Sequence, residues 1–293
     1  MEVGQAVREL GGLASREALL RVVAVRDLER AVVSGEVVRM RRGVYGLPGL
    51  DADRAAAIAI GGPLSHLSAA LAHGWKVRLP PERPQVMVPR GRNVAQSRRR
   101  GVGLRWGAVT PQELVAGIRG EVATVLDCAR DLPLEDALAV ADSALRAGVP
   151  RGDLLRACSR LPRTGRSRAL EVVELADARA ANPFESVVRA VLLGVPGTCF
   201  EPQQWIGTLG RADLLDRRLR LAVEADSFEF HADAAALRRD TERYNAFVGE
   251  GYRVVRFAWA HAMFDQDYVR ATVTAAARVQ ERSVRSCGTC TAA

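Results

Sequence analysis

Three of the acidic side chains in the segment RADLLDRRLRLAVEAD have a spacing that could do chemistry. Asp213 lies in one apolar stretch, and Glu224 and Asp226 lie in the next. Both stretches are typical of β-strands, and the two-residue period of a strand places Glu224 and Asp226 on one face. Carboxylate oxygens are hard ligands that suit Mg²⁺ or Mn²⁺, which can bind a scissile phosphate and activate water. We therefore expect Asp213, Glu224 and Asp226 to be metal ligands.

The elements around these acids follow a definite order. NPFESVVRAVLLG predicts a helix with Asn182 as N-cap, Pro183 at its first position and Glu185 near the third. Further on, DTERYNAFVGEGYRVVRF predicts a helix, a glycine turn and a strand. The predicted order is helix, strand, strand, helix and strand. Because solvated strand ends often carry Asp and Glu, the spacing of the acids alone also fits ordinary surface positions.

This order resembles the PD-(D/E)XK restriction-endonuclease-like core, and more closely the very-short-patch-repair-like domains. The resemblance covers residues 182 to 280. The positions that match the family's pattern are Glu185, Asp213, Glu224, Asp226, His231, Asp240, Arg243 and Arg256. It implies phosphodiester hydrolysis with Mg²⁺ or Mn²⁺, in which Glu185 orients a water. His231 would then be the general acid or base, and Arg243 and Arg256 would neutralise the phosphate. A structural pairing of these arginines with Asp213 or Asp240 is an equally good alternative.

One position departs from the superfamily's pattern. Its lysine should follow the second acid by two residues, but Asp226 stands there, and Lys76 is the only lysine of the chain. A cation that assists the reaction must then be an arginine or His231. The very-short-patch-repair-like branch also replaces the lysine, and the resemblance implies a histidine at the position that His231 matches. The alternative is a domain of the same fold that no longer cuts.

Composition favours an anionic partner. The 293 residues carry a net charge of +8, and nucleic acid is the commonest partner of such a chain. The near-exclusive use of Arg also fits a GC-rich genome, so the count of arginines alone does not indicate phosphate recognition. No long apolar run marks a membrane span, and MEVGQAVREL has no signal-peptide core, so we expect a cytoplasmic protein. The five cysteines are expected to be free thiols.

Residues 4 to 48 contain a second informative pattern. GQAVRELGG, SREALLRVV and VRDLERAVVSG predict three short helices, and EVVRMRRGVYGLPG predicts a two-stranded hairpin. This is the pattern of a winged helix-turn-helix. The arginines expected to contact DNA are Arg26 and Arg30 on the third helix and Arg39, Arg41 and Arg42 on the wing. A small helical domain that binds protein is the alternative.

The same segment resembles the N-terminal winged-helix domain of AbiEi-type antitoxins. That resemblance covers about 45 residues and implies a DNA-binding autorepressor. It also implies a toxin as a protein partner, whereas the C-terminal resemblance implies a repair protein. A regulator with an inactive nuclease-fold domain is therefore the alternative to an endonuclease.

The rest of the chain predicts an α/β (α+β) multi-domain protein. We expect a winged helix at 1–50, a small α/β unit at 51–110, a helical connector at 111–181, an endonuclease-like mixed sheet with flanking helices at 182–280, and a flexible tail at 281–293. Between residues 83 and 105 the chain has no acid, so Arg98, Arg99 and Arg100 are a further candidate DNA contact.

Together these patterns predict a DNA-binding, metal-dependent endonuclease or nickase that acts on double-stranded DNA and has no membrane contact. An enzyme acting on RNA stays open, because no aromatic-rich face separates the two substrates.

Overall fold

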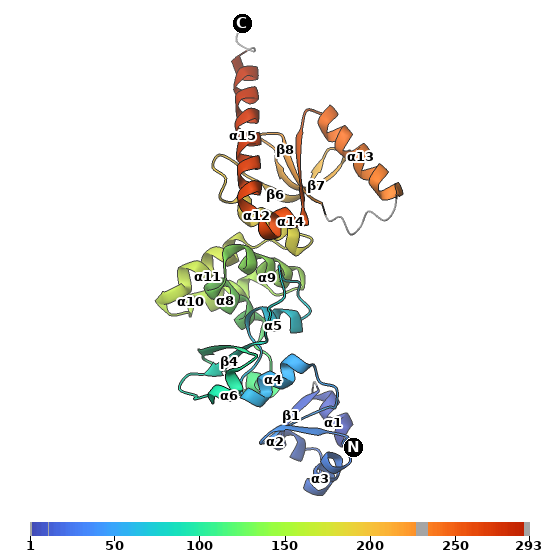
Figure 1. Cartoon of the computed structure of the whole chain (residues 1–293), viewed down its shortest axis with the longest axis vertical. Helices are drawn as coiled ribbons and strands as arrows, with labels where there is room; N and C mark the ends of the chain where they lie inside the picture. Colours follow the sequence, from blue (N-terminus) through green and yellow to red (C-terminus); the bar gives the residue numbers. More distant parts are fainter. Residues whose placement is uncertain (1, 11, 227–233, 290–293) are drawn as a thin grey trace. The chain divides into compact units, whose positions relative to one another are not determined.

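A computed structural model describes residues 2–10, 12–226 and 234–289. The chain divides into two compact units. Unit 1 comprises Met1–Trp75 and Leu79–Cys128, and unit 2 comprises Lys76–Arg78 and Ala129–Ala293. Helices and three small sheets build them (Figure 1), which confirms the predicted α/β multi-domain class. In the described ranges, no helix has both the length and the apolar character needed to cross a membrane.

The first part of unit 1 is a three-helix domain with a small sheet. Its elements are α1 (Val3–Glu9), β1 (Leu13–Ser15), α2 (Arg16–Leu20), α3 (Val25–Val33), β2 (Val38–Arg41) and β3 (Val44–Gly46). The three helices and the β2-β3 hairpin are those predicted from the sequence, and the Ser15 hydroxyl caps α2 by accepting from the Ala18 amide at 3.0 Å. The antiparallel sheet has the order β1-β3-β2. Strand β1 was not predicted, because three residues are too few to show a period.

The second part of unit 1 contains a parallel strand pair. Its elements are α4 (Ala52–Ile60), α5 (His66–Ala72), β4 (Gln85–Pro89), α6 (Gln96–Arg99), β5 (Gly103–Gly107) and α7 (Pro111–Ala116), followed by α8 (Glu121–Asp131). Strands β4 and β5 are parallel. A buried network holds the segment after them: the Arg119 guanidinium donates to Glu113 Oε2 at 2.8 Å and to Asp127 Oδ2 at 2.9 Å.

Unit 2 begins with a helical layer that packs against the helix carrying Glu185. The layer consists of α9 (Leu134–Arg146), α10 (Arg151–Ser159) and α11 (Arg163–Leu175), and the helix is α12 (Pro183–Leu192). Asp142 on α9 and Arg189 on α12 form an ion pair of 2.8 Å, and their side chains are 0% and 6% exposed. Helices α9 and α12 therefore pack against each other.

The rest of unit 2 is a mixed sheet. Its elements are β6 (Glu201–Ile206), β7 (Gly210–Asp216), β8 (Leu221–Asp226), α13 (Ala234–Gly249), β9 (Arg253–Ala258), α14 (Trp259–Phe264) and α15 (Gln266–Thr289). The strand order is β6-β7-β8-β9, antiparallel except for the parallel pair β8-β9. Strand β6 is an addition to the predicted order, because EPQQWI contains a proline and two glutamines and shows no apolar alternation.

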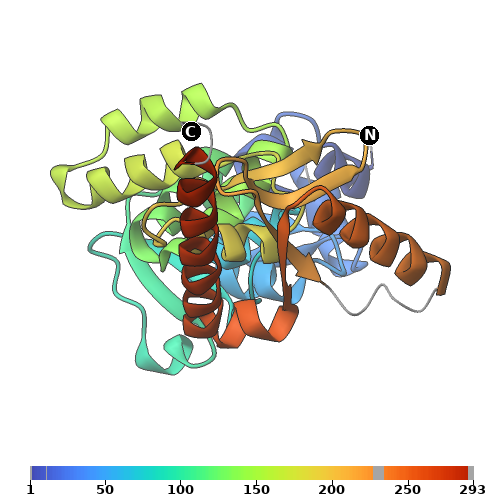
Figure 2. The same cartoon turned by 90° about the horizontal axis from the view of Figure 1, so that it is seen from above.

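Helices cover both faces of this sheet. Leu214, Val223 and Phe257 belong to a core shared with α12, α14 and α15. Ala222 of β8 belongs instead to a second core, which includes Phe247 of α13. Helix α13 accordingly lies on the opposite side of the strands from α15 in both views (Figures 1 and 2).

The last helix differs from the prediction. Residues 281 to 289 were expected to belong to a flexible tail, but α15 extends to Thr289. Glu281 lies 3.8 Å from Arg218 in an ion pair, and the Ser283 hydroxyl donates to the Val279 carbonyl at 3.2 Å. Glu281, Arg282 and Arg285 are good helix formers, which favours continuation of the helix past residue 281.

Candidate active site

Strands β7 and β8 bring the predicted acids to one place. Glu224 and Asp226 of β8 both contact α13. A guanidinium nitrogen of Arg243 lies 3.1 Å from Glu224 Oε2, and the Tyr244 hydroxyl donates to Asp226 Oδ1 at 3.3 Å. The two acids therefore share a face, as the strand period predicts. On the neighbouring strand, Asp213 accepts the amide of Ala225 at 2.9 Å through Oδ2. That bond holds Asp213 against β8.

Glu185 reaches this cluster from α12. The Asn182 side chain caps the helix by accepting from the Glu185 amide at 3.0 Å, as predicted. The Glu185 carboxylate accepts from the Ala181 amide and from the Asn182 side chain, both at 2.9 Å. Its Oε2 also accepts from Gln203 Nε2 at 2.7 Å, and the same nitrogen lies 3.1 Å from Asp213 Oδ1. Glu185 therefore both caps α12 and joins Asp213 through one amide.

Neighbouring donors and cations do not fully offset the negative charge of the clustered acids. Burial, and next the charge of Asp213, raise the pKa of Glu185 to about 7 and that of Glu224 to about 8. Burial also raises the pKa of Asp213. Glu224 is only 1% exposed, and within the described part of the chain its Oε1 has no hydrogen-bond partner. Buried carboxylates without enough donors are costly to ionise, so this cluster favours a proton or a bound cation.

Two arginines and a tyrosine border the acids on the side of α13 and β9. Arg243 contacts Glu224 at 3.1 Å and Asp240 at 3.4 Å. Arg256 of β9 pairs with Asp226 at 2.5 Å. Both guanidinium groups lie over the ring of Tyr244, at 4.9 and 4.3 Å from its centroid. Asp226 is therefore tied to an arginine and a tyrosine hydroxyl.

The donor chemistry fits a hard divalent cation. Among the residues that the structure describes, no three His, Cys, Asp or Glu side chains are grouped as ligands of one metal ion. Mg²⁺ in proteins, however, usually keeps several waters and needs only one or two carboxylates. The partnerless Glu224 Oε1 and the adjacent Asp213 provide two such groups. Asp226 is a weaker candidate, because Arg256 already compensates its charge. His231 lies outside the described residues.

The arginines predicted to bind DNA in the winged helix fall into three kinds. Arg26 and Arg30 of α3 are exposed, but Asp27 lies 4.0 and 3.4 Å from them. Arg39 and Arg42 are exposed and line a cavity of 590 Å³ between α3 and the hairpin. Arg41 instead donates to the Leu114 carbonyl at 3.3 Å inside unit 1. Burial and the nearby Arg92 lower the pKa of Arg41.

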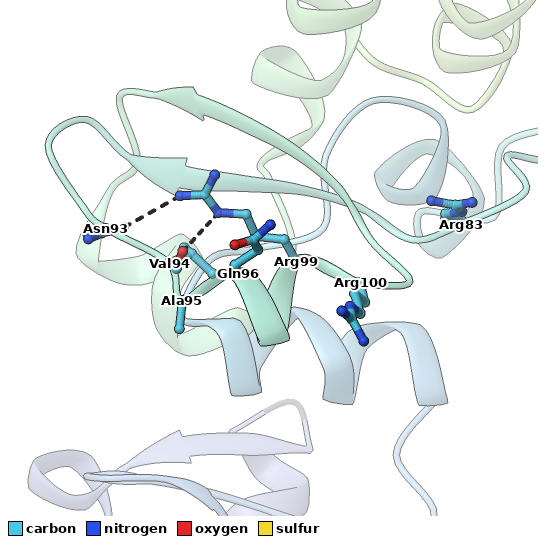
Figure 3. A pocket seen from close by; sticks show the side chains of 7 residues that line it. All are labelled: Arg83, Asn93, Val94, Ala95, Gln96, Arg99 and Arg100. Carbon is cyan, nitrogen blue, oxygen red and sulfur yellow. Dashed lines mark hydrogen bonds between the residues drawn. The ribbon is translucent and has the colours of Figure 1, made fainter.

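A second basic surface lies beside β4 and β5. A groove of 780 Å³ is lined by Arg83, Asn93, Val94, Ala95, Gln96, Arg99 and Arg100, none of which is acidic (Figure 3). The Arg99 guanidinium donates to the Val94 carbonyl at 2.8 Å and lies 5.8 Å from the centroid of the exposed Trp106 ring. Arg99 is thus fixed at the groove. Arg98, which is exposed on the same short helix, is not part of the lining.

Two polar residues of the site were missed in the sequence. Gln203 stands on β6, which was not predicted, and Tyr244 stands on α13 beside the matched Arg243. The signal for Gln203 was the pair of glutamines inside a segment next to apolar strands. A tyrosine inside an amphipathic helix carries no such signal, because most such residues belong to the core.

Comparisons with known proteins give relatives but no established function. No family model matches the chain. Two curated relatives from Mycobacterium tuberculosis strains, the uncharacterized proteins MT2308 and Rv2248, are each 32% identical over 138 residues. That region covers 45% of this chain and 51% of the relatives, so the chain spans about half the length of the curated relatives it matches. A crystal structure of the RV2827C protein from Mycobacterium tuberculosis covers 65% of this chain and 78% of its own, with 18% identity and a TM-score of 0.32.

Proposed function

We propose that the protein is a DNA-binding endonuclease that hydrolyses or nicks the phosphodiester backbone with Mg²⁺ or Mn²⁺. The observation that carries this proposal is the burial of Glu185 and Glu224 beside the half-buried Asp213, with Glu224 Oε1 left without a partner among the described residues. Such a cluster is costly to ionise, and a bound divalent cation would offset that cost. The pattern of acids on a mixed sheet also supports the resemblance to the PD-(D/E)XK core.

In this proposal each residue has a role set by its position. Asp213 and Glu224 hold the cation, which when bound polarises the phosphate and lowers the pKa of a water. The resemblance adds the Ala225 carbonyl as a third ligand. Glu185, with its pKa raised to about 7, accepts a hydrogen bond or a proton from water near neutral pH.

The remaining side chains act on the phosphate and on the leaving group. Arg243 and Arg256 lie on one side of the acids and neutralise the negative charge of the phosphate. His231 is proposed as the general acid or base from the resemblance. Asp226 orients Arg256 and Tyr244 more than it binds the cation, because both already contact its carboxylate.

Unit 1 supplies the contacts to DNA in this proposal. The exposed Arg39 and Arg42 of the wing and the groove with Arg83, Arg99 and Arg100 present positive charge without acidic neighbours in their linings, apart from Glu29 beside the wing. Phosphate contacts of this kind give affinity without sequence recognition. We place the protein in the cytoplasm with double-stranded DNA as its partner, and a toxin or repair protein as a second one.

The alternative is a transcriptional regulator in which unit 2 is inactive. The observation in its favour is Asp226: an acid bound to Arg256 at 2.5 Å occupies the position of the superfamily's catalytic lysine. A regulator would still bind DNA through unit 1, so binding does not separate the two functions. Only cleavage does.

Supercoiled plasmid is the direct test. Wild-type protein should convert it to the open-circular or linear form with Mg²⁺ or Mn²⁺ and stop when EDTA is added. Asp213→Ala and Glu224→Ala should bind DNA as the wild type does but lose cleavage by roughly 10³-fold, because several kcal/mol of charge stabilisation disappear with the cation. Wild-type protein that leaves duplex DNA and RNA intact with both metals would favour the regulator.

A further inference from the structure

Gln203 occupies an unusual backbone position in the middle of β6. Its φ is 56°, in the left-handed region that residues other than glycine seldom adopt. The pairs Pro202↔Leu214 and Gln204↔Ala212 flank it in the β6-β7 ladder, so Gln203 lies across from Asp213. Such a backbone angle costs about 1–3 kcal/mol and persists where the surrounding structure fixes it, often at functional sites.

The amide of Gln203 joins two acids that come from different elements. Its Nε2 donates to Glu185 Oε2 of α12 at 2.7 Å and to Asp213 Oδ1 of β7 at 3.1 Å. The orientation of the amide is fixed by chemistry, because a side-chain carbonyl oxygen cannot donate to a carboxylate. The neighbouring Gln204 does something different: its Nε2 donates to the Pro202 carbonyl at 3.1 Å.

We infer that Gln203 is the positioning residue that holds the Glu185 carboxylate of α12 beside Asp213, so that the helix and the strands form one cation site. This inference rests on the proposed function. Without the amide, the two carboxylates would repel each other, and Glu185 would keep only its bonds to the Ala181 amide and the Asn182 side chain at the start of α12. The cation would then lose an ordered neighbour on one side.

Residues that orient ligands in this way typically change metal affinity or activity by about 10- to 100-fold when they are replaced. The test uses the full chain with Gln203→Gly, which removes the amide and accepts the left-handed backbone. Gln203→Met is a second variant that keeps the side-chain length but cannot donate. Gln204→Ala is the matched control, one residue away on the same strand.

Mn²⁺ binding without DNA, measured by titration calorimetry, is the primary readout. Both Gln203 variants should bind Mn²⁺ about 10- to 100-fold more weakly than wild type, whereas Gln204→Ala should bind as wild type does. Plasmid nicking should show the same separation: the Gln203 variants should need more Mn²⁺ and recover at saturating Mn²⁺, with the KM for plasmid unchanged. A merely structural role would not move the Mn²⁺ requirement in this way.

The outcomes separate this inference from the function on which it rests. Wild-type binding of Mn²⁺ together with unchanged Mn²⁺ affinity in Gln203→Gly or in Gln203→Met would overturn the role of Gln203 alone. Loss of Mn²⁺ affinity in Gln204→Ala equal to that in the Gln203 variants would overturn it as well. Wild-type protein that neither binds Mn²⁺ nor cuts would overturn the proposed function and this inference together.

Discussion

Unit 1 and unit 2 each bury acidic side chains, but the donors around those acids differ. In unit 1, Arg119 donates to both Glu113 and Asp127, and backbone amides of Thr110 and Gly120 complete the bonds of Glu113. Burial acts to raise the pKa of Glu113, but these donors outweigh it and lower the pKa. In unit 2, burial and Asp213 raise the pKa of Glu224 to about 8.

The difference separates acids that stabilise the fold from acids that need a ligand. A buried carboxylate surrounded by donors contributes its charge to a fixed network and is ionised at neutral pH. A buried carboxylate with an oxygen that lacks a hydrogen-bond partner destabilises the folded state, because nothing offsets the cost of its desolvation. The next two predictions test this division.

The largest effect on stability should come from removing the Arg119 guanidinium, which Glu113 and Asp127 share in unit 1. Arg119→Met leaves Glu113 and Asp127 buried without their guanidinium partner, so the free energy of unfolding should fall by about 3–5 kcal/mol. Chemical denaturation measures this. The control is Arg21→Met, whose partner Glu17 lies 2.7 Å away in a pair that is more than 70% exposed on both sides, and which should cost at most about 1 kcal/mol. Equal losses in the two variants would erase the contrast between the units.

A smaller effect should appear in the pH dependence of unit 2 without metal. The pKa of Glu224 is raised to about 8 and that of Glu185 to about 7, so the folded state binds protons more tightly than the unfolded one. The free energy of unfolding in EDTA should therefore fall as pH rises from 6 to 8 and level off above 8. Each of the two carboxyl groups contributes a slope of at most roughly 1.4 kcal/mol per pH unit.

The double variant Glu185→Gln, Glu224→Gln should flatten that slope. Glu113→Gln should lower stability but leave the slope between pH 6 and 8 unchanged, because the lowered pKa of Glu113 makes its contribution fully present above its ordinary range. A slope that persists in the double variant would show that other groups carry the titration.

Much of unit 2 could be predicted from its sequence, because local rules determine it. Asn182 and Pro183 mark the start of α12, and alternation identifies β7 and β8 with their acids. The bridge from Gln203 to Asp213 could not be predicted, since it depends on the pairing of two strands and on a backbone angle that no local pattern signals. The pKa of Glu224 depends on burial by α13 and on Asp213, which are both tertiary contacts.

The arginines of the winged helix show the same limit of prediction from local sequence. The spacing of Arg39, Arg41 and Arg42 in the hairpin predicts three equivalent phosphate contacts. The fold separates them, because the bulge between Arg39 and Arg41 shifts the register of β2 against β3. Arg41 then donates to the carbonyl of Leu114, which lies 73 positions away in the sequence, and a local pattern cannot reveal such a contact.

The smallest effect should distinguish those arginines. Arg39→Ala and Arg42→Ala should each weaken duplex binding and lower the salt dependence of log K by about 0.9. Arg41→Ala should leave the salt dependence unchanged and instead lower the free energy of unfolding by about 1 kcal/mol, the contribution of one hydrogen bond. Fluorescence anisotropy over a salt series measures the first and denaturation the second. An equal loss of salt dependence in all three variants would contradict the inward placement of Arg41.

The ion pair between Asp142 and Arg189 bears on how unit 2 can be produced as an isolated fragment. A fragment that starts at residue 182, the boundary predicted from the sequence, would retain Arg189 and lose Asp142, its partner at 2.8 Å. It would also remove α9, the helix against which α12 packs. A fragment beginning at residue 129, before α9, is longer but keeps both sides of this contact.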